Sequence, residues 1–251
     1  AFGQGLKATL TRDGVKTALP DTGLPTSLAV VQVIDGQPNY GFYREGIADR
    51  SYTVAGVLDW LEGQTPGILH TGSLLLVPPE HEKTKAIIQA AKRQGWTISV
   101  DVNLRPKLAA DLGAYTAAVS EIAQLADWLK ASDEDLALLG YTDVNPAHAS
   151  ELAQHFPNAS RIALTFGADG AYLQVDGASA QAPVPIVDVT DTVGAGDTFW
   201  GNTLADWANI NGDAAARVTQ TLKWAMQAAA INCTRAGCQP PSKAEVQRAL
   251  G

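Results

Sequence analysis

Strand-like and helix-like segments alternate through the middle of the chain, and this alternation limits the possible folds more than any other feature. Runs rich in β-branched residues are separated by segments with apolar residues at helical spacing. The predicted strands are 68–77 (a strand with its following loop), 97–103, 128–131 and 161–166, and the predicted helices are 80–94, 114–126 and one capped by Ser132. This order is typical of a mostly parallel sheet covered by helices on both faces. We therefore predict an α/β fold forming a single domain over residues 1–251.

The two ends of the chain depart from this alternation. Residues 26–34 and 37–44 are predicted strands, and the Asp35-Gly36 pair between them is a strong hairpin signal. We interpret residues 25–44 as part of a small β lid. Because an isolated two-stranded hairpin is only marginally stable, we expect a homodimer that covers it. After the last parallel strand, residues 170–175 are predicted to return beside 161–166, and the final third is largely helical, over 196–208 and 214–232.

Polar residues gather where the predicted strands end. Open parallel sheets bind ligands beyond the carboxyl ends of their strands, so these residues are candidates for a site. They are Asp101, Asn103 and Arg105; Lys130 and Ser132; Thr165 and Gly167; and the segment from Asp191 to Asp197. His70 also follows an apolar run, and we interpret it as a core histidine.

The segment Asp191-Thr192-Val193-Gly194-Ala195-Gly196-Asp197 is the strongest candidate. Residues 184–189 are predicted to form a strand that leads into it, and a helix follows. The free N–H groups and the dipole of a helix N-terminus bind anions, and glycine allows close approach of a phosphate. The carboxylate of Asp197 would repel that anion unless it takes the proton of the attacking group. The plainer alternatives are a tight strand-to-helix turn and an ordinary acidic residue in a first helical turn.

Composition excludes several classes of protein. The chain has 251 residues, 46% of them hydrophobic, and a net charge of −8, which argues against disorder and against nucleic acid as a partner. Cys233 and Cys238 are too few for a disulfide framework and are expected to pack rather than to bind metal. No run approaches the ~20 apolar residues of a membrane span, and no signal peptide is visible. We expect a cytoplasmic protein without a membrane partner.

Four segments together resemble the ribokinase/PfkB-type carbohydrate kinases. Asp191–Asp197 matches the family's Asp-Thr-x-Gly-Ala-Gly-Asp signature. The other three are 101–106, similar to Asp-x-Asn-x-Arg; 164–171, similar to the Thr-x-Gly-x-x-Gly nucleotide loop; and 230–237, similar to the late adenine-side helix and loop. Residues 42–45 and 130–135 look most like the fructokinase branch.

The resemblance implies a ribokinase-like three-layer α/β/α fold and ATP-dependent phosphorylation of a sugar, with fructose to fructose 6-phosphate as the leading reaction. It implies the following roles: Asp197 as the base; the backbone of Val193, Gly194, Ala195 and Gly196 as the anion hole; Arg105 on phosphate or substrate; Tyr43, Arg44 and Asn103 on the sugar; and Lys130, Ser132, Thr165, Gly167, Gly170 and Asn232 on the nucleotide. Mg²⁺ would be held mainly by ATP oxygens, with Asp135 acting through water, and a monovalent cation such as K⁺ would lie near Asp191.

Departures from the family pattern leave alternatives open. The Gly-Gly-x-x-x-Asn segment that grips the sugar is absent from this sequence, and we expect a preceding piece to carry it. The family's Asn-x-x-Glu motif is Ser132-Asp133-Glu134-Asp135 here. One alternative is a kinase of an acid sugar such as 2-keto-3-deoxygluconate, because Tyr43, Arg44 and Arg105 suit a carboxylate. Another is a non-catalytic sugar- or nucleotide-binding protein. A dinucleotide-binding dehydrogenase is disfavoured, since no Gly-x-Gly-x-x-Gly follows an early strand.

Overall fold

The computed structural model describes residues 2–18, 22–34, 37–43, 45–209 and 213–251. The chain divides into two compact units, Ala1–Thr65 and Pro66–Gly251. We call them the N-terminal unit and the C-terminal unit and describe each by itself. Among the described residues, no helix has both the length and the apolar character needed to cross a membrane.

The N-terminal unit contains the predicted hairpin. β1 and β2 pair antiparallel, with Leu28 opposite Tyr43 and Ile34 opposite Gln37, which confirms the two predicted strands. The unit's helices and strands are α1 (Phe2–Arg12), β1 (Leu28–Ile34), β2 (Gln37–Tyr43) and α2 (Val54–Glu62). The turn residues Asp35 and Gly36 lie outside the described residues. Leu28, Val30 and Tyr43 are exposed, and both the lid and the homodimer stay predictions.

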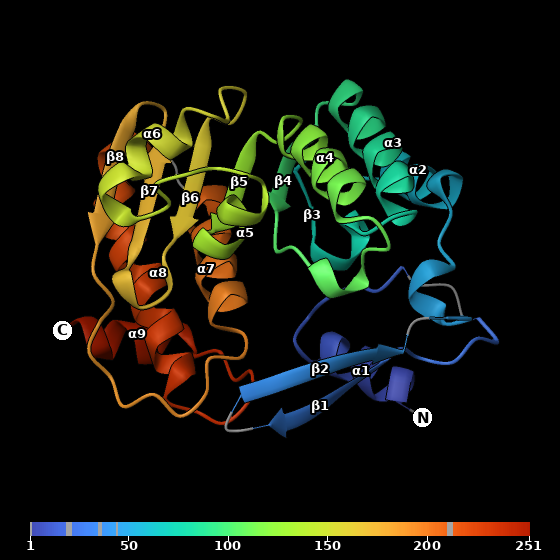
Figure 1. Ribbon diagram of the computed structural model, residues 1–251, viewed down its shortest axis with the longest axis horizontal. Helices are drawn as coiled ribbons and strands as arrows, with labels where there is room; N and C mark the ends of the chain where they lie inside the picture. The colour runs from blue at the N-terminus through green and yellow to red at the C-terminus, as the bar shows by residue number, and fades with distance from the viewer. Residues whose placement is uncertain (1, 19–21, 35–36, 44, 210–212) are drawn as a thin grey trace. The chain divides into compact units, whose positions relative to one another are not determined.

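The C-terminal unit is built on a twisted sheet whose described strands run in the order β3-β4-β5-β6-β7-β8 (Figure 1). Strands β3 to β6 are parallel, and β7 and β8 add antiparallel to that edge. The strands are β3 (Ile68–Gly72), β4 (Thr97–Asp101), β5 (Trp128–Ser132), β6 (Arg161–Thr165), β7 (Ala171–Val175) and β8 (Ala178–Ala182). The mostly parallel α/β sheet predicted from the alternation is therefore confirmed.

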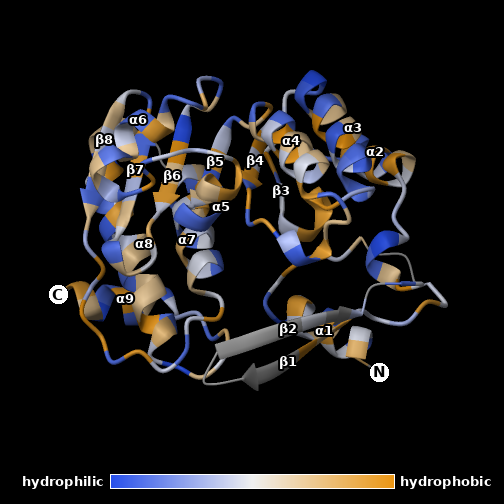
Figure 2. Cartoon of the chain, viewed as in Figure 1, coloured by the Kyte–Doolittle hydropathy of each residue, from blue (hydrophilic) through white to orange (hydrophobic). Residues whose placement is uncertain are grey.

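Helices cover both faces of this sheet. In Figure 1, α3, α4 and α6 lie on the near face, and α7 and α8 lie behind the strands. The helices are α3 (Glu80–Arg93), α4 (Leu112–Ala123), α5 (Asp133–Leu138), α6 (Ala149–Ala153), α7 (Ala195–Asn209), α8 (Val218–Cys233) and α9 (Lys243–Leu250). Figure 2 shows that α3 is largely hydrophilic, as expected for a helix that buries only one stripe against the sheet.

The core between the sheet and α7 and α8 is rich in tryptophan. Trp207 packs edge-on against both Trp128 and Trp200, with ring centroids 5.6 Å apart in each pair. Phe199 and Leu222 join the same buried cluster. Because α7 is fixed by this large apolar contact, its first turn has a defined position over the carboxyl ends of the strands.

One predicted strand is wrong. Residues 184–189 form no strand, although most of them are β-branched. Strand β8, which comes just before them, was not predicted from the sequence. Pro183 and Pro185 remove two backbone donors, so the segment cannot complete a hydrogen-bonded ladder. Ile186 is fully exposed, and Val189 is 62% exposed. The glycine segment is therefore reached through an extended loop, while the helix predicted after it is confirmed as α7.

Candidate active site

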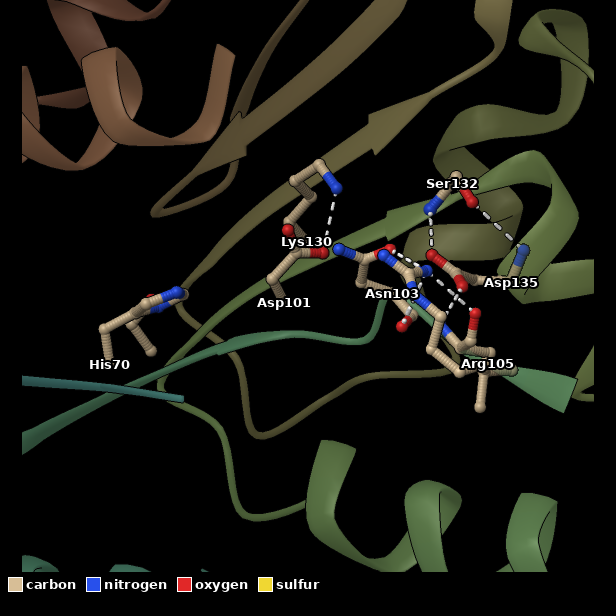
Figure 3. A network of polar contacts seen from close by, with 9 residues as sticks. His70, Asp101, Asn103, Arg105, Lys130, Ser132 and Asp135 are labelled. Carbon is tan, nitrogen blue, oxygen red and sulfur yellow. Dashed lines mark hydrogen bonds and ion pairs between the residues drawn. The ribbon is translucent and has the colours of Figure 1, made fainter. Parts of the chain in front are cut away.

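The strand register brings the predicted polar residues together on one face of the sheet. Asp101 pairs with Lys130, and Ser132 pairs with Thr165. Residues directly opposite one another on neighbouring strands point to the same side, which here is the side covered by α7. Figure 3 shows Asp101, Lys130 and Ser132 in one view with Asn103 and Arg105.

A buried ion pair lies at the centre of this region. Lys130 Nζ donates to Asp101 Oδ1 over 2.8 Å, and the two side chains are 5% and 6% exposed. Burial raises the pKa of Asp101, and the ammonium of Lys130 opposes that rise. A Cβ on Gly196 would lie 3.6 Å from Lys130 Nζ, so the ammonium is beside the first turn of α7. A positive charge next to the positive end of a helix favours an anion there.

Removing one member of this pair is expected to destabilise the protein strongly. Lys130→Met leaves Asp101 as a buried carboxylate without its counter-ion, which typically costs about 3–5 kcal/mol. The double variant Asp101→Asn, Lys130→Met keeps no buried charge and is expected to lose less stability than the single variant. Urea unfolding of the three proteins measures the difference. Equal stability of Lys130→Met and the parent protein would contradict the buried pair.

The loop after β4 is held by its own side chains. Arg105 Nη1 donates to Asn103 Oδ1 over 2.6 Å and to the carbonyl oxygen of Leu104 over 3.0 Å. Asn103 has a φ of 38°, an unusual value for a residue with a side chain. The Arg105 N–H donates to the hydroxyl of Tyr115 over 3.1 Å. One nitrogen of Arg105 therefore fixes the orientation of Asn103, the residue predicted to bind the sugar.

Asp135 connects this loop to the start of α5. Its Oδ1 accepts from the Leu104 N–H over 2.7 Å, and its Oδ2 accepts from the Ser132 N–H over 2.9 Å. The Ser132 hydroxyl accepts from the Asp135 N–H, which completes a capping box and confirms the predicted helix cap. Asp135 is 4% exposed, and each of its carboxylate oxygens has a backbone partner. The contact of Asp135 with Mg²⁺ through water stays a prediction.

The glycine segment makes a tight turn into α7. Gly194 has a φ of 77°, which glycine adopts without strain. The Val193 N–H donates to Asp191 Oδ1 over 3.0 Å, and the Ala195 N–H donates to the Thr192 carbonyl oxygen over 3.1 Å. Among the described residues, no acceptor is seen for the N–H groups of Gly194 and Gly196. Two of the four predicted donors are thus used inside the loop, and the binding of an anion by the N–H groups of Gly194 and Gly196 stays a prediction.

A second loop, formed by residues 234–239, supports the glycine segment. Asp191 Oδ2 accepts from the Gly237 N–H over 2.8 Å. The hydrogen bonds from Val193 and Gly237 lower the pKa of Asp191. A Cβ on Gly194 would lie 2.3 Å from Cys238 Sγ, so the two loops are in close contact there. The carboxylate of Asp191 therefore joins the two loops, and a monovalent cation near it stays a prediction.

Asn232 also supports the glycine segment. It is completely buried, at 0% exposure. Its Nδ2 donates to the Val193 carbonyl oxygen over 2.9 Å, and its Oδ1 accepts from the Gln239 N–H over 2.9 Å. A side chain so enclosed cannot touch a nucleotide in this conformation, so we assign Asn232 to support of the glycine segment. Within the described part of the chain, no cluster of three or more His, Cys, Asp or Glu side chains could hold a metal ion.

The turn between β6 and β7 carries the predicted nucleotide residues. Thr165 ends β6, and Gly167 and Gly170 have φ values of 51° and 110°. A Cβ on Gly170 would lie 2.2 Å from the Ala182 carbonyl oxygen on β8, so close packing against the edge strand already requires glycine there. The role of these three residues on the nucleotide stays a prediction.

The remaining predicted residues differ in their setting. Asp197 lies exposed in the first turn of α7. Its charge opposes the lowering of the His70 pKa by burial and adds to the burial-driven rise of the Cys238 pKa. Tyr43 belongs to the N-terminal unit and is 65% exposed, and Arg44 lies outside the described residues.

His70 was interpreted from the sequence as a core histidine, and that interpretation is wrong. Its side chain is exposed on the same face of the sheet as Asp101. The alternation of apolar and polar residues in the short β3 segment was the only local signal for this position, and it does not distinguish an exposed strand end from a buried one.

Comparison with known proteins gives one family. A family model described as pfkB family carbohydrate kinase matches residues 1–245. A fructokinase of Rhizobium leguminosarum bv. trifolii is 36% identical over 187 residues, which are 73% of this chain and 55% of that enzyme. The chain therefore spans about half the length of this relative in the matched region.

Solved structures agree with the fold. The fructokinase of Vibrio cholerae O395, in its fructose-, ADP- and calcium-bound form, superimposes with a TM-score of 0.84 at 26% identity, covering 100% of this chain and 82% of that one. A putative ribokinase II from E. coli gives a TM-score of 0.82 at 23% identity, covering 100% of this chain and 79% of that one. These likenesses confirm the expected ribokinase-like three-layer α/β fold.

Proposed function

This chain belongs to the pfkB family of carbohydrate kinases, and from that premise we propose that it transfers the γ-phosphoryl group of ATP to a hydroxyl of fructose. Kinases of this family phosphorylate sugars, and fructose is the substrate class named for the Rhizobium and Vibrio relatives. The single observation that carries the proposal is the accessible carboxylate of Asp197 directly after the Gly194 and Gly196 donors, beside the buried Lys130 ammonium.

The proposed step follows from that arrangement. The sugar oxygen attacks the γ-phosphorus in line, its proton passes to a carboxylate oxygen of Asp197, and the bond to the bridging oxygen breaks to leave ADP. The free N–H groups of Gly194 and Gly196 donate to phosphate oxygens as charge builds on them. Lys130 adds positive charge from beneath the first turn of α7.

The nucleotide is proposed to lie on the β6–β7 side of this turn. Thr165, Gly167 and Gly170 border that side, and Ser132 is in register with Thr165. ATP supplies the phosphoryl group, and a divalent cation such as Mg²⁺ would enter with its phosphate oxygens, since Mg²⁺ prefers phosphate and water ligands. On the sugar side, Asn103 is oriented by Arg105, and Tyr43 and Arg44 stay proposed sugar residues.

A substrate panel tests the function directly. The protein is incubated with ATP and fructose, glucose, ribose or 2-keto-3-deoxygluconate, and ADP release is measured. We expect the highest kcat/KM with fructose. If kcat/KM for 2-keto-3-deoxygluconate exceeds that for fructose more than tenfold, the proposed substrate would be an acid sugar instead of fructose. ATP binding in calorimetry without turnover of any sugar would overturn the kinase activity and leave a nucleotide-binding protein.

A further inference from the structure

His70 is an ionisable side chain in this region that the proposed phosphoryl transfer does not use. It lies on β3, opposite Ser99 of β4 in the sheet register. The residue is partly exposed, and its Nδ1 is 3.0 Å from the hydroxyl oxygen of Ser99, which is itself completely buried. A buried hydroxyl that holds one ring nitrogen fixes the direction of the other.

The second ring nitrogen is available to a ligand. Among the described residues, no hydrogen-bond partner is seen for Nε2. In the neutral ring, Nε2 donates a hydrogen bond in one tautomer and accepts one in the other. A sugar hydroxyl can accept in the first case and donate in the second. Figure 3 shows the His70 ring on the same side of the sheet as Asp101 and Lys130.

Burial favours a neutral His70 ring, and the nearby carboxylates favour a neutral ligand. Burial lowers the pKa of His70, Lys130 lowers it further, and Asp197 opposes this shift. Asp101 is two residues after Ser99 on β4 and therefore points to the same face of the sheet, where it adds a second carboxylate near His70. Two carboxylates near His70 would repel a phosphate more than a hydroxyl.

The strand order places His70 away from the predicted nucleotide turn, on the side where the sugar acceptor would bind. The predicted nucleotide turn follows β6, and Lys130 beneath the glycine turn lies on β5, two strands from β3. Three strand spacings of about 4.8 Å separate β3 from β6, or roughly 14 Å. In-line transfer requires the acceptor and the nucleotide to lie on opposite sides of the moving phosphoryl group. A group on β3 is therefore positioned to meet the acceptor.

We propose that Nε2 of His70 hydrogen-bonds a hydroxyl of the sugar acceptor and that Ser99 holds the ring for this contact. This inference rests on the proposed sugar kinase activity and adds a residue that determines which sugar binds. The nucleotide does not contact His70 in this arrangement, so the residue affects the KM of the sugar and leaves the KM of ATP unchanged.

Paired amide variants test the contact. The amide of His70→Gln lies near the position of Nε2, whereas the amide of His70→Asn lies near Nδ1 and keeps only the contact with Ser99. We expect His70→Asn and His70→Ala to raise the KM of the sugar about tenfold, the effect of one lost hydrogen bond. His70→Gln is expected to stay within about threefold of the parent protein. Ser99→Ala is expected to raise the same KM by a smaller factor.

Controls separate this contact from a structural role and from failure of the proposed function. His155→Asn, an exposed histidine between α6 and β6, should leave both KM values unchanged. If the parent protein phosphorylates the sugar and His70→Asn keeps its sugar KM, the inference is overturned, and a lower melting temperature alone would then show a structural role. If the parent protein phosphorylates no sugar, the proposed function falls, and the inference falls with it.

Discussion

Asp197→Asn is expected to lower kcat for sugar-dependent ADP release by about 10²–10⁴-fold, the usual contribution of a positioned general base. Asparagine has nearly the same shape and cannot accept the proton of the attacking hydroxyl. The KM of the sugar should change little if Asp197 acts mainly in the transition state. Steady-state kinetics with saturating ATP measures the effect, and calorimetry checks that ATP still binds.

The plainer role of Asp197 is an acidic residue in a first helical turn, and a matched variant tests it. Glu134 is an exposed acid in the first turn of α5. Interaction with a helix dipole contributes roughly 0.3–1 kcal/mol to stability. If both acids act only on their helices, Asp197→Asn and Glu134→Gln will each reduce stability slightly and leave kcat unchanged. That outcome would remove Asp197 from the mechanism.

Gly194→Ala is expected to reduce kcat by about 10²–10³-fold, as loss of a preorganised donor does. The added Cβ would lie 2.3 Å from Cys238 Sγ, closer than any real contact. Alanine also adopts the observed φ of 77° only with strain of about 1–2 kcal/mol. The turn must therefore shift, and its free N–H groups shift with it. Kinetics and thermal unfolding together measure both effects.

Two further variants divide this effect into its causes. Gly201→Ala changes a glycine of α7 with no atom within 4 Å of the new Cβ, and it should keep full activity and gain up to about 1 kcal/mol of stability. Cys238→Gly combined with Gly194→Ala removes the overlap with the cysteine side chain and retains the backbone strain, so partial recovery is expected. Full activity of the single Gly194→Ala variant would contradict the anion-hole role of this turn.

Local sequence signals predicted much of the architecture. Strands β3 to β7 and helices α3, α4, α7 and α8 follow from apolar periodicity, and the cap at Ser132 follows from its spacing to Asp135. The failure at residues 184–189 shows the limit of such signals, since β-branched residues favour a strand only where a neighbouring edge can accept it. Pro183 and Pro185 prevented that pairing.

The site was predictable as a set of residues and not as a set of contacts. Asp101 and Lys130 were both expected near the strand ends, yet their buried ion pair joins residues 29 positions apart and depends on the register of β4 and β5. Asn232 was expected to reach the nucleotide and instead supports Val193, 39 positions away. Whether a polar side chain faces a ligand or its own chain is decided by packing between distant segments.

The sequence by itself determined the parallel α/β architecture, the glycine turn before α7 and the carboxylate that follows it, because these features depend on residues close together in the chain. Only the tertiary structure decided that Gly194 and Gly196 keep free donors, that Asp191 and Asn232 support the turn, and that His70 is exposed on the same face of the sheet as Asp101. The physical reason is that burial and hydrogen-bond partners are set when strands and loops from distant parts of the chain come into contact.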